Sequence, residues 1–328
     1  NGELLDLPAF GANPDHKDLF VQVDYVEEQL DSQVFEFVAQ AFAAAPLANP
    51  DGQNGVTLHM DGGSWTYMSG TGPTTWETYS ESKQLDGSGL SVPFDLTLEN
   101  LEYLVNQNFA DSPRIGDGRG VPQLFKYFVN SPAFEGDVIG KAYIQGNYGA
   151  VCLTNAWLTA TASWMNNLLT FKWQWFASAA NAARASNLMH EIGHNLGLLH
   201  HGAEPEPKDD PEYKSIMSYA YNVWGVDGTI DYSRQDQVNY DWKMGSSLGS
   251  LTFVLGQHGE LAEGFYDRGD GIYGVDGPIP QEPTLEEFLS ASDPQVVLDF
   301  AGRFPQILKQ AVLDELTALS PALSGTPR

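Results

Sequence analysis

HEIGHNLGLLH, the sequence of residues 190–200, is the stretch that decides how this chain folds around its candidate site. Residues four apart share one face of a helix, so His190 and His194 can offer both imidazoles to a single metal ion. Glu191 lies one residue further round the helix, where a base can take a proton from a water bound to that ion. The spacing therefore predicts a helix that carries two metal ligands and a general base.

A third ligand, His200, requires this helix to end. A continuous helix would carry His200 about 9 Å beyond His194, whereas a zinc–nitrogen bond is only about 2 Å long. Gly197 can adopt the left-handed backbone conformation that ends a helix and turns the chain back. Three neutral imidazoles leave a fourth tetrahedral position open for water, which is typical of a catalytic zinc site. His201 could compete for the ion, but the spacing from Gly197 favours His200.

A second motif follows at residues 215–219, with the sequence SIMSY. Taken with HExxHxxGxxH, it resembles the metzincin clan of zinc endopeptidases. The resemblance implies that Met217 forms a hydrophobic floor beneath the three imidazoles, and that Tyr219 lies near the metal and hydrogen-bonds the tetrahedral intermediate. From the residues alone, Met217 also fits an ordinary core methionine, and Tyr219 a core tyrosine whose hydroxyl is satisfied locally.

The metzincin resemblance implies an α+β fold but leaves the subfamily open. The fold would contain a twisted mixed β-sheet, a long active-site helix and a smaller irregular or helical C-terminal subdomain. Asn195 resembles reprolysin-like sequences, whereas the Met-Ser-Tyr turn and Gly-Leu-x-His resemble serralysin-like ones. His201 stands where astacins usually have glutamate and reprolysins aspartate. No glycine- and aspartate-rich calcium repeats follow the motif, so a full serralysin architecture is not expected.

The length of 328 residues allows one large domain or two modest ones. We expect a catalytic domain at residues 1–259, with an upper subdomain up to about residue 197 and a lower one from residue 198. Residues 260–328 are expected to form a C-terminal helical extension packed on that domain, because their apolar positions recur with helical spacing. A module that binds a partner is the alternative interpretation of the extension.

The net charge of −27, from 43 acidic and 16 basic residues, argues against nucleic acid or anionic membranes as partners. No apolar run is long enough to span a bilayer, so no membrane insertion is expected. We expect protein or peptide substrates and a monomer. The single cysteine, Cys152, excludes an intramolecular disulfide and is expected to be a buried thiol. Secreted animal metzincins often carry several disulfides, so a chain with one cysteine is expected to be an exported bacterial or archaeal enzyme. Its start, without a signal peptide, fits a mature form that has lost its signal and pro-segments, and a trimmed chain would look the same.

Periodicity and composition place the remaining elements. Strands are expected at residues 19–26, 55–60, 123–129, 139–145 and 150–154, and helices at 32–46, 98–109 and 173–196.

Three further expectations concern caps, loops and the substrate-binding region. Ser32 is expected to cap the first helix. Residues 61–97 are expected to form a long surface loop. By the metzincin resemblance, the strand at residues 141–143 would be an edge strand that pairs with extended substrate, although an edge strand without a ligand fits the pattern equally well. Residues 221–242 would shape a pocket with aromatic walls, formed by Trp224, Tyr232, Tyr240 and Trp242.

These observations favour a zinc-dependent endopeptidase with one catalytic Zn²⁺. Glu191 would deprotonate the attacking water and then deliver the proton to the leaving amine. Asp267, Asp270 and Asp276 could bind Ca²⁺ through oxygen ligands, although they lack EF-hand spacing and a plain acidic turn is favoured. Two other functions stay open: a zinc hydrolase of a non-protein amide, such as a cell-wall or lipid-linked bond, and a catalytically silent metal-binding or adhesion module. The intact Glu191 argues against the silent module.

Overall fold

A computed structural model of the chain describes residues 7–64, 66–69, 72–76, 79–86, 95–109, 125–134, 138–144, 146–152, 173–202, 207–223, 225–226, 229–234, 241–244, 266–267 and 273–274. Of the predicted C-terminal extension, only the short antiparallel pair β10 (Tyr266–Asp267) and β11 (Tyr273–Gly274) is described. The helices predicted there, and the domain boundary at residue 259, lie outside the described residues.

The fold is built on a five-stranded mixed sheet. The strands run in the order β2 (Thr57–Asp61), β1 (Asp18–Tyr25), β6 (Phe125–Asn130), β9 (Tyr148–Val151) and β8 (Gly140–Ala142). The first four strands are parallel to one another, and β8 runs antiparallel to β9. Almost the whole of β1 is buried, including the polar side chains of Asp18, Gln22 and Asp24, as expected of an inner strand whose two faces are both covered. The predicted α+β class and the predicted edge position of β8 are confirmed within the described residues.

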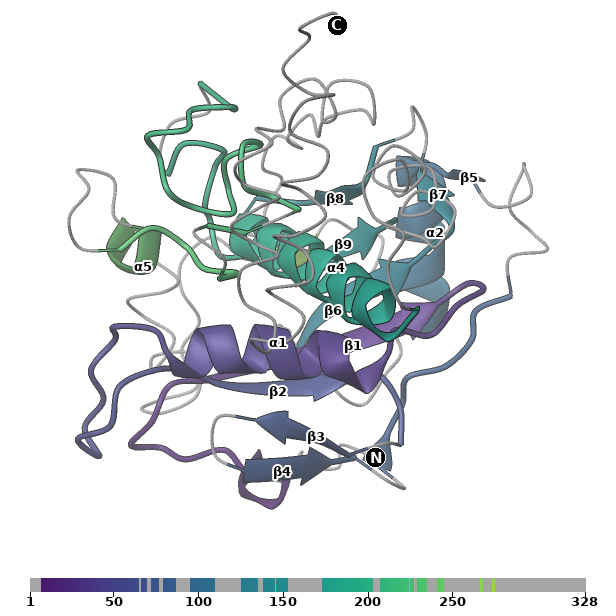
Figure 1. The fold of residues 1–328 in the computed structure, drawn as a ribbon. Coiled ribbons are helices and arrows are strands. Elements are labelled where there is room, and N and C mark those ends of the chain that lie inside the picture. Colours follow the sequence, from purple (N-terminus) through teal and green to yellow (C-terminus); the bar gives the residue numbers. More distant parts are fainter. Residues whose placement is uncertain are drawn as a thin grey trace, which may run out of the picture.

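Two helices lie side by side on one face of the sheet (Figure 1): α1 (Ser32–Ala43) and α4 (Trp173–Asn195). A third helix, α2 (Leu98–Asn108), packs on the opposite face. Phe109, directly after α2, stacks on Tyr127 of β6, whereas the neighbouring Lys126 reaches the end of α4. Successive strand residues point to opposite faces of a sheet, so α2 and α4 lie on opposite sides. No helix in the described ranges is long and apolar enough to cross a membrane.

The N-cap of α1 differs from the sequence prediction by one residue. Asp31, not Ser32, has the extended backbone conformation of a cap, and its carboxylate accepts a hydrogen bond from the Gln33 backbone N–H at 2.8 Å. A carboxylate also suits the positive end of the helix dipole better than a hydroxyl does. The helix then buries Val34, Phe35 and neighbouring apolar residues against the sheet.

Part of the segment predicted as a surface loop, residues 61–97, is a hairpin of β3 (Thr66–Ser69) and β4 (Gly72–Thr75). Two of its aromatic residues, Tyr67 and Trp76, are buried, whereas Tyr79 is exposed. The Tyr67 hydroxyl accepts a hydrogen bond from the Met60 backbone N–H, and the Trp76 indole N–H donates to the Met60 carbonyl at 2.8 Å. These side chains satisfy the main-chain groups on the outer edge of β2, where an open strand would otherwise invite intermolecular pairing. Further along, β5 (Asp95–Leu96) pairs with β7 (Ala133–Phe134).

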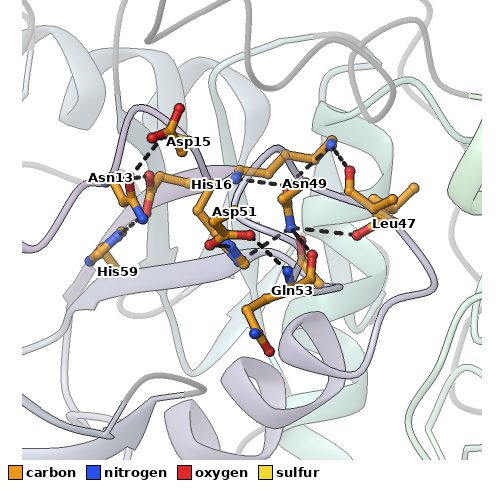
Figure 2. A network of polar contacts seen from close by, with 12 residues as sticks. Asn13, Asp15, His16, Leu47, Asn49, Asp51, Gln53 and His59 are labelled. Atoms are coloured by element: carbon orange, nitrogen blue, oxygen red, sulfur yellow. Dashed lines mark hydrogen bonds and ion pairs between the residues drawn. The ribbon is translucent and has the colours of Figure 1, made fainter.

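A polar network joins the connections that lead into β1 and β2 (Figure 2). Asn49 is its hub: the side-chain amide donates to the Gly55 carbonyl at 2.9 Å, and its oxygen accepts from the Lys17 backbone N–H at 3.0 Å. At the surface, His16 Nδ1 lies 2.8 Å from the Asp51 carboxylate. These contacts fix the start of β1 against the loop before β2, which is a structural role.

Candidate metal centre

Gly197 ends α4 in the way that the sequence predicts. Its φ is +97°, in the left-handed region that favours glycine. The Leu198 N–H donates to the Gly193 carbonyl and the Gly197 N–H to the His194 carbonyl, both at 2.9 Å. This pair of bonds is a Schellman motif, which satisfies carbonyls at the helix end and reverses the chain. The turn brings His200 back towards α4.

The three predicted metal ligands, His190, His194 and His200, come together in the core. All are buried, and each offers one ring nitrogen within 4.8 Å of the others. The Nε2 atoms of His190 and His194 are 3.1 Å apart. Zinc–nitrogen bonds of 2.0–2.1 Å at a tetrahedral angle would separate two ligand nitrogens by about 3.3 Å.

Hydrogen bonds fix which ring nitrogen of His190 and of His194 faces the centre. His190 Nδ1 lies 2.7 Å from the Ile216 carbonyl and His194 Nδ1 lies 2.8 Å from the Leu198 carbonyl. A carbonyl only accepts, so each Nδ1 carries the proton and each Nε2 presents a lone pair. Two lone pairs facing each other in the core repel unless an electropositive centre lies between them. The donor set and its backbone supports therefore fit a metal ion.

His201 takes no part in this cluster. Its Nε2 lies 3.1 Å from the Asp210 carboxylate, and its ring packs on Tyr213 with the centroids 4.7 Å apart. The spacing to Gly197 favoured His200 over His201, and in the structure it is His200 that lies with His190 and His194. The contacts of His201 therefore join the loop after α4 to the segment before residues 215–219, which we call the methionine turn.

Met217 is fully buried and packs against α4 at Gly193, the one position there without a side chain. A Cβ on Gly193 would lie 2.5 Å from the Met217 sulfur, so the glycine makes room for the methionine between the two helical ligands. Sequence reasoning treated Gly193 only as part of the motif spacing. Its local signal is weak, because glycine within a helix is unfavourable unless packing requires it.

A buried carboxylate anchors the methionine turn. The Ser215 hydroxyl accepts from the Met217 backbone N–H at 3.1 Å and donates to Asp241 at 2.5 Å. Asp241 also accepts hydrogen bonds from the Tyr213 hydroxyl and, at 2.9 Å, from the Ser233 backbone N–H. Burial raises the pKa of Asp241, and the hydrogen bonds from Ser215 and Tyr213 oppose that rise. The short helix α5 (Asp241–Met244) that supplies this carboxylate was not predicted, since nothing near it in the sequence indicates its partner.

Tyr219 lies beside His200, the third predicted ligand. Its ring packs on that of His200, with the centroids 4.5 Å apart and the planes tilted by 60°. The Tyr219 backbone N–H donates to the Lys208 carbonyl at 2.7 Å, and the Lys208 ammonium lies 5.9 Å from the centre of the tyrosine ring. Tyr219 is therefore next to the candidate metal centre.

Glu191 is fully buried and lies directly under the edge strand. A Cβ built on Gly140 of β8 would fall 2.3 Å from Glu191 Oε1 and 2.8 Å from its carboxyl carbon. The backbone of β8 thus approaches the carboxylate more closely than any other residue type would permit. Gly140 was not singled out from the sequence, because its requirement comes from a residue 51 positions away.

Two of the four predicted pocket aromatics are core residues instead. Tyr232 and Trp242 are buried and pack on each other, with the ring centroids 4.9 Å apart. The Tyr232 hydroxyl donates to the Met189 carbonyl of α4 at 2.5 Å. They hold the segment after the methionine turn against α4. Trp224 and Tyr240 lie outside the described residues.

The structure does not test the predicted calcium ligands. Asp267 lies in β10, and Asp270 and Asp276 lie outside the described residues. Within the described ranges, the histidine triad is the single group of three or more side chains that could hold a metal ion. Cys152 is buried, as the sequence predicts.

Comparison with known proteins gives no match to this chain from protein-family models, from curated proteins or from solved structures.

Proposed function

We propose that this chain is a zinc-dependent endopeptidase of the metzincin clan. The observation that carries the proposal is the buried cluster of three imidazoles with the Glu191 carboxylate on the same helix. Zinc held by these imidazoles would supply a Lewis acid that polarises the scissile carbonyl and acidifies a water molecule. The protein supplies the orientation of the imidazoles, a general base and an edge for the substrate.

Glu191 acts as the proton carrier in this proposal. One residue after His190 on the same helix, its carboxylate can accept a proton from the attacking water and later donate it to the leaving amine. Burial beneath β8 keeps bulk water away from the carboxylate, which strengthens its interaction with a nearby positive charge. Tyr219, packed on His200, would donate a hydrogen bond from its hydroxyl to the developing oxyanion.

The substrate would bind as an extended chain along β8. This strand ends the described sheet, so its outer main-chain groups can pair with a peptide. Gly140 places the strand backbone directly over Glu191, and a paired peptide would therefore pass close to the base. Main-chain pairing selects extended backbone rather than particular side chains, which suits an endopeptidase acting on unfolded protein. The net charge of −27 would favour neutral or basic peptides.

A comparison of the wild-type protein with Glu191→Gln tests the proposal. Glutamine has the size of glutamate but cannot accept the proton, so we expect hydrolysis of casein to fall by at least about 10²-fold, in line with the contribution of general base catalysis. Metal content, measured by atomic emission, should stay at one zinc per chain. His194→Ala is the matched control on the next turn and should lose both zinc and activity.

The outcomes separate the alternatives. Equal casein hydrolysis by the wild type and Glu191→Gln would refute the mechanism. Failure of the wild-type, zinc-loaded protein on every unfolded protein would refute the endopeptidase assignment and point to a non-protein amide as substrate. Zinc binding without hydrolysis of either substrate class would indicate the silent module.

A further inference from the structure

Two asparagines of α4 lie on either side of the His190–His194 pair. Both contact the hairpin of β8 and β9, which we call the edge hairpin. Asn187 precedes His190 by three residues, and Asn195 follows His194 directly. The Asn187 side-chain amide donates to the Ile139 carbonyl at 2.8 Å, immediately before β8. The Asn195 side-chain amide donates to the Tyr143 carbonyl at 2.9 Å, immediately after β8.

The distance between the two asparagines along α4 matches the distance between their acceptors along β8. Eight residues of helix rise by about 12 Å, and the four-residue step from Ile139 to Tyr143 spans about 13 Å of extended strand. Helix and strand therefore run alongside each other in the same direction, with one hydrogen bond at each end of β8. Glu191 lies midway between the two asparagines, under Gly140.

The contacts are directional. Asn195 also donates to the Tyr148 carbonyl at 3.1 Å, so all three acceptors of the two asparagines are main-chain carbonyls. The amide NH₂ group must therefore face the hairpin in both residues. Among the described residues, the side-chain oxygens of Asn187 and Asn195 are buried and accept no hydrogen bond. The fold thus uses these side chains as donors.

A third group supports the same hairpin. The Lys126 ammonium donates to the Gly146 carbonyl at 2.7 Å, in the turn between β8 and β9, and lies 3.5 Å from the Asn195 carbonyl at the end of α4. A cation at the C-terminal end of a helix is favourable, and here it joins that end to the hairpin turn.

We infer that Asn187 and Asn195 are positioning residues that hold β8 at a fixed place over the Glu191 carboxylate. Their role in turnover rests on the proposed endopeptidase function. They act through β8: a peptide paired to this strand meets the general base only if the strand keeps its distance and register along α4. Removing either donor frees one end of the strand, and a misplacement of about 1 Å at a reacting centre costs about 10²-fold in rate.

The test uses Asn187→Asp and Asn195→Asp in the full chain. Aspartate has the same shape but places a second oxygen against the carbonyls in place of the N–H donor. Asn181→Asp is the matched control, because Asn181 lies on the same helix and donates to the Gln33 side chain at 3.2 Å instead of to β8. For each variant, kcat and KM of an extended peptide are measured per zinc-loaded molecule, together with amide hydrogen exchange over residues 138–152.

We expect Asn187→Asp and Asn195→Asp to bind one zinc, to exchange faster across residues 138–152, and to lose about 10²-fold in kcat/KM. The control should match the wild type in kcat, KM and hairpin exchange. Unchanged kcat and KM per zinc-loaded molecule would overturn the inference, even if thermal stability falls. Unchanged hairpin exchange would also overturn it. A wild-type protein that cleaves no peptide would refute the proposed function instead, and the exchange measurement would still decide whether the asparagines hold β8.

Discussion

Gly140→Ala is the most informative substitution in this fold, because its effect should come mainly from one contact, between the new methyl group and the Glu191 carboxylate. The added Cβ would lie 2.3 Å from Glu191 Oε1, whereas ordinary contact begins at 3.4 Å. The carboxylate must therefore move by about 1 Å, and if Glu191 is the general base we propose, such a displacement lowers the rate by about 10²-fold. This loss corresponds to about 2.7 kcal/mol of transition-state stabilisation. Forcing a methyl group into a packed site should also lower the free energy of unfolding by about 1–3 kcal/mol.

A double-mutant cycle with Glu191→Ala isolates the contact. Once the carboxylate is absent, the nearest remaining atom to the new Cβ is the Ala150 carbonyl oxygen at 3.1 Å, which a shift of a few tenths of an ångström relieves. Gly140→Ala should therefore destabilise the wild type much more than the Glu191→Ala protein, and the difference is the coupling energy. Urea unfolding of the four proteins gives this value directly.

Activity provides the second readout of the same cycle. Gly140→Ala should retain one zinc per chain and lose turnover of a peptide substrate. Two results would refute the reasoning: full activity in Gly140→Ala, or an equal loss of stability from Gly140→Ala with and without Glu191. Either result would mean that the strand and the carboxylate are not in the close contact described here.

Three further predictions concern the turn, the methionine and a buried carboxylate. Gly197→Ala, with φ at +97°, should cost about 1–2 kcal/mol in unfolding free energy and weaken zinc binding in a chelator competition, since this turn delivers the third ligand. Met217→Ala should cost about 2–5 kcal/mol and Met217→Leu less than about 1.5 kcal/mol in urea unfolding; equal costs would contradict tight packing at Gly193. Burial raises the pKa of Asp24 from 3.8 to about 6, so the folded state binds a proton more tightly than the unfolded state. The free energy of unfolding of the wild type, relative to that of Asp24→Asn, should therefore increase as the pH falls from about 6 to 4, and this gain should be lost as the pH is raised above 6. Parallel dependence of the two unfolding free energies on pH would exclude this effect of Asp24.

The sequence alone determined which histidines come together in the candidate metal centre, because local geometry encodes their placement. A helix places residues four apart on one face, and a glycine that tolerates positive φ is the simplest device for returning a third ligand. His190, His194 and His200 could therefore be identified from spacing, and His201 could be set aside. The edge position of β8 was expected only from the metzincin resemblance, and the structure places this strand at the end of the described sheet.

Tertiary structure alone decided what surrounds that centre. Gly140 lies against Glu191, and Asp241 anchors the methionine turn through Ser215, across separations in sequence that no local pattern records. The same limit explains the errors: Tyr232 and Trp242 looked like pocket walls but fill the core against α4, and Tyr67 closes the edge of β2 from a segment that looked like a loop. Periodicity reports which face of an element is apolar. Which element covers that face depends on contacts between distant segments, and these form only when the whole chain packs.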